Sequence, residues 1–579
     1  MKKLFSVFVV LALVLGIAAC NGSVEDNTLF WNIGADPLTI DPTLNGASDG
    51  GDVINQTFEG LVREINGVVY PGIAESWETS TDGKTVTFTL RESNWSDGTP
   101  LTASDFVYSW KRGMDPRTAS EYAWIWEYTN VVGSLDTIYW TDVCNNTTEE
   151  CNEYDDDGAL VGTDYSDDKD DVTGLTVDEQ LALVGVRAVD DLTLEVKLVN
   201  PAAYFVSLMA FYHFLPVKQS AVEATGGEDG LWAKNPDLVV SNGAFVLVEY
   251  TAGEGLRLEK NEEYWNKKEV YIEAIEGDFV DLETTAYAKY NAGEYDFIPN
   301  VPSMMIPDLM ALSEEFYSFP LLGTYYYSFN LDRAEWQNAN LRKALALAIN
   351  REDITEALSA GQIPATGFVP VGFTDNEGKD FATESGNYGI ETDNGGEAQA
   401  VALFAQAATE MGKTVAELQT YLDGKVILYN NGEGHQMVAE MVQEDWKSVL
   451  GIELTLGNQE WAVFQDTRRE GNFDLARGGW LTDFMDPAGL LAIFTTDNAY
   501  NDPKYDKAAY NTLLSESQST TDMAVHFQKL YEANDMLMAD MPIIPIYYYS
   551  DVMMAKSYLK DWGRSVLGSV DFTHAKLER

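Results

Sequence analysis

Hydrophobic and polar positions alternate or recur at helical spacing along most of the chain after residue 28. Residues 29–33 and 85–90 have the pattern of strands, and in the second of these Val86, Phe88 and Leu90 share one face. Thr102 stands three positions before Asp105, which predicts a helix over residues 104–112. Apolar spacing predicts another helix over 435–450, a strand over 452–456 and a short helix over 461–469. The pattern predicts a mixed α/β protein.

The stretch FDLARGGWLTDFMDP, residues 473–487, joins a strand pattern to groups that suit a peptide ligand. Its first residues alternate as in a half-buried strand, and Gly478 and Gly479 then remove two side chains, so that a second backbone could approach. Trp480 supplies an apolar wall and Asp483 a carboxylate. An exposed strand edge beside an acid can add an extended peptide and hold its terminal ammonium. The plain alternative is a strand that runs into an Asp-Pro turn.

Length and charge limit the class of protein. A chain of 579 residues is too long for one core and should hold three or four domains. The 93 acidic side chains outnumber the 37 basic ones and leave a formal charge of −56. So negative a surface repels nucleic acid and anionic lipid headgroups, which excludes both as partners. It also suggests a saline habitat, where salt screens the self-repulsion.

The N-terminus has the features of an export signal. Lys2 and Lys3 precede an apolar run over residues 4–19, which is short for a membrane span. The run ends in small residues before Cys20 and resembles a bacterial lipobox, in which residues 1–20 hold the signal and Cys20 carries the lipid. The alternative is an ordinary secretory signal. Residues 21–28 would form a tether, and we expect a protein lipid-anchored to the outer face of the cytoplasmic membrane, or periplasmic.

Two further features lie in the acidic region of residues 134–183. Cys144 and Cys151 form an even pair outside the cytoplasm, which suggests a small disulfide loop, and two free thiols are the alternative. A calcium-loop template also fits here in part, through the acids Glu153, Asp155, Asp157 and Asp164. The default interpretation of this stretch is a solvated charge run without a metal.

Several ordered motifs resemble one family. They are PGIAESWETSTDGKTVTFTLRESNWSDGTPLTASDFVYSWKR at 71–112, SNGAF at 241–245, LEKNEEYW at 258–265, TYYY at 324–327, LRKALALAINR at 341–351 and PIIPIYYY at 542–549. Together they resemble the large solute-binding proteins of ABC importers, and among these the oligopeptide-binding proteins. The likeness covers nearly the whole mature chain. Residues 134–183 and 375–397 depart from the family pattern.

The resemblance implies an α/β, two-lobed periplasmic-binding-protein-like fold with three domains and mixed sheets joined by a hinge. Domain I would comprise residues 29–59, 201–322 and 551–579. Domain II would comprise residues 60–200 with the acidic insertion, and domain III residues 323–550. The lobes would close around the ligand, which is the motion that an importer senses.

The resemblance also implies the binding residues. Asp483 would pair with the ammonium of the peptide, while Gly479 and Trp480 would offer main-chain groups. Arg477 is a candidate for the peptide carboxylate, and an internal ion pair with Asp474 or another acid is its alternative role.

Further residues of the cleft follow from the family spacing. Ser48 would pair through its backbone with the peptide. Tyr325, Tyr326 and Tyr327 would begin a strand near the hinge and line the cleft, although one or two of them are expected to be core.

The resemblance implies an oligopeptide carrier that delivers its ligand to an ABC permease, and we expect it to act as a monomer without a cofactor. An exported hydrolase is the competing class, but the sequence holds no HExxH or GxSxG motif and only four histidines, His213, His435, His526 and His574. A nearer alternative keeps the fold and binds a dipeptide, a nickel chelate or an oligosaccharide. The acid at 483 favours a ligand with a free amino terminus.

Overall fold

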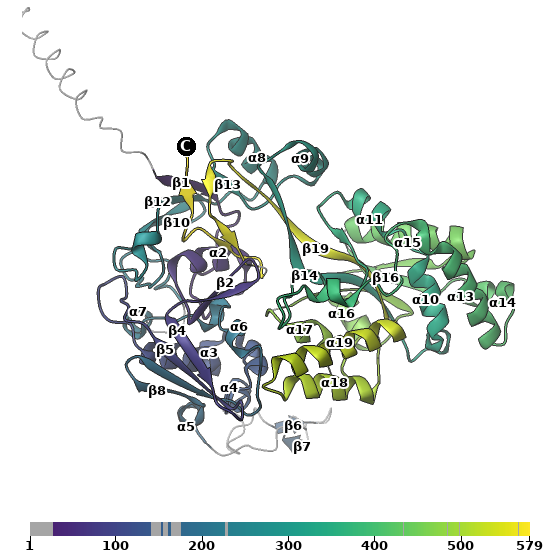
Figure 1. The fold of residues 1–579 in the computed structure, drawn as a ribbon, viewed down its shortest axis with the longest axis horizontal. Coiled ribbons are helices and arrows are strands. Elements are labelled where there is room, and N and C mark those ends of the chain that lie inside the picture. The colour runs from purple at the N-terminus through teal and green to yellow at the C-terminus, as the bar shows by residue number, and fades with distance from the viewer. Residues whose placement is uncertain are drawn as a thin grey trace, which may run out of the picture.

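The structure is a computed structural model that describes residues 27–140, 152–154, 160–163, 175–225, 230–431, 433–482, 484–496, 498, 500–565 and 567–579. Two lobes lie side by side, and two long strands run between them, β14 (Phe316–Phe329) and β19 (Ile543–Ala555) (Figure 1). The expected mixed α/β, two-lobed architecture is confirmed. No helix in the described part of the chain combines the length and apolar character that a membrane crossing requires.

The largest sheet has eleven strands and continues from one lobe into the other through β14 and β19. Its order is β10 (Phe245–Thr251), β11 (Gly255–Lys260), β12 (Ala274–Asp278), β1 (Thr28–Asn32), β13 (Phe297–Ile298), β19, β14, β18 (Leu475–Leu481), β16 (Val426–Asn430) and β17 (Thr455–Gln459), with β15 (Ile363–Pro364) on β19. Parallel and antiparallel pairs occur in it: β1 runs parallel to β12, and β14 antiparallel to β18. The first and last parts of the chain therefore share one sheet with the middle.

The lobe that contains β1, which we call the first lobe, holds a second sheet, of order β4 (Ala74–Thr79), β5 (Thr85–Leu90), β9 (Thr193–Lys197) and β8 (Val186–Asp190). Helix α3 (Ala103–Met114) packs on β8 and β9, and its start is fixed because Asp105 Oδ2 accepts the N–H of Thr102 at 2.8 Å. The other helices here are α2 (Ser48–Thr57), α4 (Ser134–Ile138), α5 (Val177–Leu183), α6 (Phe205–Leu208), α7 (Gln219–Glu223), α8 (Glu283–Ala292) and α9 (Ile306–Leu312).

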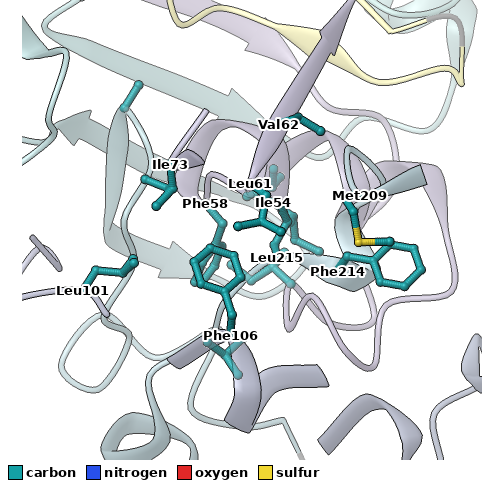
Figure 2. Packing of buried hydrophobic residues seen from close by; sticks show 14 of the residues in the cluster. Ile54, Phe58, Leu61, Val62, Ile73, Leu101, Phe106, Met209, Phe214 and Leu215 are labelled. Atoms are coloured by element: carbon teal, nitrogen blue, oxygen red, sulfur yellow. The ribbon is translucent and has the colours of Figure 1, made fainter. Parts of the chain in front are cut away.

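Short two-stranded ladders complete this lobe. They are β2 (Val62–Ile65) with β3 (Val68–Pro71), β20 (Leu559–Lys560) with β23 (Lys576–Leu577), and β21 (Gly563–Arg564) with β22 (Val570–Asp571). A further ladder pairs β6 (Asn152–Tyr154) with β7 (Leu160–Thr163). Figure 2 shows part of the core, where Phe58 and Ile54 of the α2 region lie near Phe106 of α3.

Helices cover the sheet strands of the second lobe (Figure 1). They are α10 (Ala339–Leu347), α11 (Arg351–Leu358), α12 (Phe381–Ser385), α13 (Glu397–Glu410), α14 (Val415–Leu422), α15 (Glu433–Leu450), α16 (Trp461–Arg469), α17 (Ala488–Leu491), α18 (Ala508–Gln518) and α19 (Met523–Asp540). The predicted helix 461–469 is confirmed over the same residues, and the helix 435–450 begins two residues earlier. The strand predicted over 452–456 is wrong in position, because residues 452–454 connect α15 to β17.

Two large clusters of buried apolar side chains mark the lobes. We call the lobe around the first cluster the first lobe, residues 27–319 and 552–579, and the lobe around the second cluster the second lobe, residues 322–549. The first cluster joins side chains from both sides of residue 60 and both sides of residue 200. The predicted division of this region into domains I and II, with its boundaries, therefore stays a prediction.

The two crossing strands change register between the lobes. Residues Phe316 to Pro320 of β14 pair with Met554 to Ser550 of β19, and pairing resumes at Thr324 opposite Tyr548. A second shift follows between Tyr325 and Tyr326. Residues 321–323 thus lie in a gap of the β14–β19 ladder, which makes this point of the connection easier to bend than the paired parts.

Candidate functional site

Strand β18 lies in the second lobe and carries Arg477, Gly479 and Trp480. It pairs with β14 along its whole length, from Leu475 opposite Phe329 to Leu481 opposite Gly323. On its other side β16 pairs only with Leu475 and Ala476. The sequence predicted an exposed edge over this stretch. Among the described strands, β18 is covered on both sides at its beginning and is open on one side only from Arg477 to Leu481.

The hydrogen-bond alternation of the ladder decides which main-chain groups face the open side. The N–H of Thr482 donates to the carbonyl of Leu322 at 2.9 Å. In an antiparallel pair every second residue has this orientation, so the main chain of Trp480 also faces β14. The N–H and C=O of Gly479 face the open side instead. The register therefore makes Gly479 suited to main-chain pairing with a ligand, whereas the expectation that Trp480 offers its backbone does not fit.

The two glycines of β18 are needed because of tyrosine side chains. A Cβ atom at Gly478 would lie 2.4 Å from a ring carbon of Tyr326, and one at Gly479 would lie 2.3 Å from the hydroxyl of Tyr549. The prediction from the sequence was that the two glycines let a second backbone approach, and the structure limits where this can happen. Their faces are filled by neighbouring rings, and only the strand edge is open.

Arg477 is a cation that has no acidic partner among the described residues. Its guanidinium lies 5.1 Å from the ring centroid of Tyr325 and donates a long hydrogen bond of 3.4 Å to the Tyr549 hydroxyl. Its Nε is buried without a hydrogen-bond partner, and no salt bridge involves it among the described residues. Asp474, the alternative partner, instead lies 3.3 Å from Arg333 and 3.8 Å from Lys425. Burial of a charge without a partner costs free energy, unless a ligand of opposite charge pairs with it.

His435 lies beside Arg477 in the first turn of α15. Its ring centroid is 5.6 Å from that of Tyr325, with an interplanar angle of 30°. Burial and the positive charge of Arg477 lower the pKa of His435 to about 4, so the imidazole is neutral at neutral pH. In the sequence, His435 was a candidate only for a hydrolase or zinc site. No local pattern could have joined it to Arg477, because the two meet through the order of the strands.

The three consecutive tyrosines divide between two faces of β14. Tyr325 and Tyr327 lie on the face of Arg477, and Tyr325 stacks on Tyr547 at 4.6 Å. Tyr326 points to the opposite face and packs edge-to-face on Phe368 at 5.5 Å. All three are buried. All three belong to the buried apolar cluster of the second lobe, more than the one or two that were expected to be core, and Tyr325 in addition lies against the Arg477 guanidinium.

Trp480 is held on the face opposite Arg477. Its Nε1 donates to the carbonyl of Gly489 at 3.0 Å, and its ring centroid lies 4.6 Å from that of Tyr500. The indole is partly exposed. It is thus a fixed apolar surface at the end of β18.

The segment that follows β18 is held by several hydrogen bonds. The carbonyl of Phe484 accepts from the Thr482 hydroxyl at 3.0 Å and from the N–H of Asp486 at 2.9 Å. Asp486 Oδ1 accepts the N–H of Ala488 at 2.9 Å, and its Oδ2 lies 2.8 Å from Nε2 of His526. These bonds fix residues on both sides of position 483.

The first lobe contributes Ser48, the first residue of α2, which is exposed. A cavity of about 220 Å³ lies between the lobes at this point. Ser48, Asn55 and Tyr212 line it from the first lobe, and Leu481 and Thr482 from the second. The end of β18 and the start of α2 therefore face a common space. N–H groups in the first turn of a helix have no acceptor within the helix and can bind a ligand.

Other predicted residues lie outside the described part of the chain. They are Asp483, Cys20, Cys144, Cys151, Asp155, Asp157 and Asp164. Glu153 falls in β6. Within the residues that are described, no group of three or more histidine, cysteine, aspartate or glutamate side chains is arranged to hold a metal ion.

The fold and this site agree with one family of binding proteins. The family model for bacterial extracellular solute-binding proteins, family 5, matches residues 68–502. The chain belongs to this family.

A relative with similarity along the whole chain is the oligopeptide-binding protein OppA of Bacillus subtilis, which is 32% identical and aligned over 99% of both chains. Among solved structures, the unliganded open form of the periplasmic murein tripeptide-binding protein MppA is 30% identical. It covers 96% of this chain and 98% of its own, with a TM-score of 0.78. Haemophilus influenzae OppA in complex with the peptide RPPGFSPFR is also 30% identical, with 96% and 99% coverage and a TM-score of 0.63.

Proposed function

We propose that this protein captures oligopeptides between its two lobes and delivers them to the permease of an ABC importer. The observation that carries the proposal is the open side of β18, where Gly479 directs its main-chain groups away from β14. An extended peptide there adds a strand, so that main-chain bonds supply affinity without reading the peptide's side chains. The names of the relatives, OppA and MppA, agree with this ligand class.

Asp483 is proposed to bind the terminal ammonium of the peptide. It follows β18 by two residues, and the hydrogen bonds of Thr482 and Asp486 hold the chain on either side. Loss of one partner of a buried, hydrogen-bonded charge pair costs about 2–5 kcal/mol. A free amino terminus is therefore the feature of the ligand that we expect to matter most.

Arg477 is proposed to bind a carboxylate of the peptide. Its side chain lies within hydrogen-bond reach of the Tyr549 hydroxyl and has no acidic partner among the described residues. The adjacent His435 is neutral, so its imidazole has one N–H that can donate to a ligand. A ligand carboxylate would satisfy the guanidinium and remove the cost of its burial.

The lobes are proposed to close by bending at the gap in the β14–β19 ladder. The structure is more similar to the unliganded open MppA, with a TM-score of 0.78, than to peptide-bound OppA, with 0.63, at equal sequence identity. This difference supports an open arrangement here. Peptide binding would then bring Ser48 of α2 toward β18 and enclose the ligand.

Calorimetry with a tripeptide and its N-acetylated form tests this function. We expect the free form to bind at least about thirtyfold more tightly, from the lower end of the cost of an unpaired charge. Asp483→Ala should fold normally and lose this preference. Asp466→Ala is the matched control, because Asp466 is an exposed acid on α16 in the same lobe. Wild-type affinity in Asp483→Ala would disprove the assignment, and equal affinity of the wild type for both peptides would favour a sugar or chelate ligand.

We further propose that the protein binds its ligand without chemical change. Support comes from family membership and from the scattered histidines: His213 contacts Trp126, while His526 contacts Asp486. Peptides incubated with the protein should be recovered intact by mass spectrometry. New cleavage products that require the protein would indicate a hydrolase.

The remaining proposals concern location and covalent state. A lipid on Cys20 would hold the protein at the membrane, and Cys20→Ser should then appear in the soluble extracytoplasmic fraction. For a Cys144–Cys151 disulfide, reduction should raise the mass of the proteolytic fragment that contains both cysteines by two hydrogens. Calcium binding at Glu153, Asp155, Asp157 and Asp164 is tested by the melting temperature with calcium and with chelator. Size-exclusion chromatography tests the expected monomer.

A further inference from the structure

Phe484 belongs to the second lobe by sequence but to the first lobe by packing. Its side chain is 2% exposed and lies in the first lobe's apolar cluster. Within the described part of residues 323–550, no other side chain belongs to that buried cluster. Phe484 is therefore a contact between the lobes that is separate from the crossing strands.

Two tyrosines of the first lobe form the surface that Phe484 meets. The ring of Tyr204 stacks on Phe484 with centroids 4.8 Å apart and planes at 27°, and the ring of Tyr128 lies at 5.4 Å and 49°. Aromatic pairs at such separations gain energy beyond the area they bury. The ring of Phe484 thus has specific partners across the lobe boundary.

The other side of the same segment is tied to the second lobe. His526 of α19 is fully buried, and its Nε2 lies 2.8 Å from Asp486 Oδ2. Its Nδ1 lies 2.8 Å from the carbonyl oxygen of Ser517, which can only accept, so Nδ1 donates. Asp486 is in turn bonded to the start of α17. The segment after β18 is therefore fixed to one lobe by Asp486 and to the other by Phe484.

We propose that Phe484, through its contact with Tyr204, is a positioning residue for ligand selectivity. This inference rests on the proposed function, in which the ligand's free amine is recognised just after β18. A segment anchored in both lobes keeps its place only while both anchors hold. Removal of the ring contact leaves the segment held by the Asp486 anchor alone, and the preference for a free amine should then fall. The first lobe thereby sets the amine selectivity of a group carried by the second.

The experiment measures the affinity ratio between a free tripeptide and its N-acetylated form for a set of variants. Phe484→Leu and Tyr204→Leu each remove one ring, and each should lower the ratio by about tenfold, a coupling in the range found for residues in contact. The double variant should lower it no further, because both changes break the same contact. Tyr204→Phe keeps the ring and should keep the ratio.

A matched control separates positioning from general loss of stability. Phe381 stacks on Tyr531 at 4.1 Å within the second lobe, so Phe381→Leu removes a similar aromatic contact away from the lobe boundary. This variant should lower the melting temperature and leave the ratio unchanged. If the wild type discriminates between the peptides and the two leucine variants keep its ratio, the inference is overturned while the proposed function stands. If the wild type does not discriminate, both are overturned.

Discussion

Replacement of Arg477 by methionine should weaken ligand binding without weakening the fold. The guanidinium has a buried Nε without a hydrogen-bond partner and no ion pair among the described residues. Its contacts with the described residues include a 3.4 Å hydrogen bond to the Tyr549 hydroxyl and the Tyr325 ring at 5.1 Å. A cation–π contact contributes about 0.5–2 kcal/mol, and burial of a charge without a partner costs at least as much. The free energy of unfolding without ligand should therefore be unchanged or slightly raised.

The effect on binding should be large and specific for the ligand's carboxylate. Loss of a buried charge partner costs about 2–5 kcal/mol, which is a decrease in affinity of about thirtyfold or more. Calorimetry with a peptide acid and the matching peptide amide measures the contribution of the ligand's carboxylate to affinity. The wild type should prefer the acid, and Arg477→Met should bind both with similar, weak affinity.

Arg469→Met on α16 is the control, because Arg469 is an exposed arginine close in sequence whose nearest carboxylate, on Asp466, is 3.9 Å away. It should keep the preference of the wild type. An unchanged preference in Arg477→Met would refute the assigned carboxylate contact. A large loss of stability in the absence of ligand would show that the reasoning about an unsatisfied charge is wrong.

Three further predictions concern stability. Gly478→Ala should cost about 1–3 kcal/mol in urea unfolding, because its Cβ would meet the Tyr326 ring at 2.4 Å, whereas Gly434→Ala in α15 meets only an ordinary 3.6 Å contact and should be neutral or stabilising. Burial lowers the pKa of His526, but the Asp486 carboxylate and the Ser517 carbonyl outweigh it, so the pKa is raised. The stability advantage of the wild type over His526→Gln should therefore be full below about pH 6.5 and decline as pH rises through the raised pKa. An advantage that grows with pH would contradict this. The charge of −56 predicts a melting temperature that rises from low to high salt, and a flat series would count against it.

Local patterns in the sequence were sufficient for many elements of the fold. The Thr102–Asp105 pair fixes the start of α3, and the alternation of residues 85–90 matches β5 because one face of that strand is buried. The strand after α15 was placed three residues too early, since the apolar residues Ile452 and Leu454 are buried in the connection rather than in a strand. Burial alone does not distinguish these two cases.

The site was only partly predictable, because its groups meet through the topology. The sequence singled out Arg477 and Gly479, but the direction of the Gly479 main chain depends on the register with β14. His435 and Tyr549 reach Arg477 from a helix and a strand that are distant in the chain. In the sequence Phe484 is indistinguishable from an ordinary core residue of the second lobe, and no pattern shows that it packs in the core of the first lobe.

The gap in the β14–β19 ladder has a practical consequence for the use of this protein as a sensor. If the lobes close as proposed, by bending where residues 321–323 interrupt the pairing of β14 with β19, dyes on α2 and α16 would report ligand capture as a change in energy transfer. A covalent clamp across the gap would hold the dyes at one separation whatever the ligand concentration. Residues 321–323 would thus determine the change in dye separation, and the clamped protein would give the reference signal.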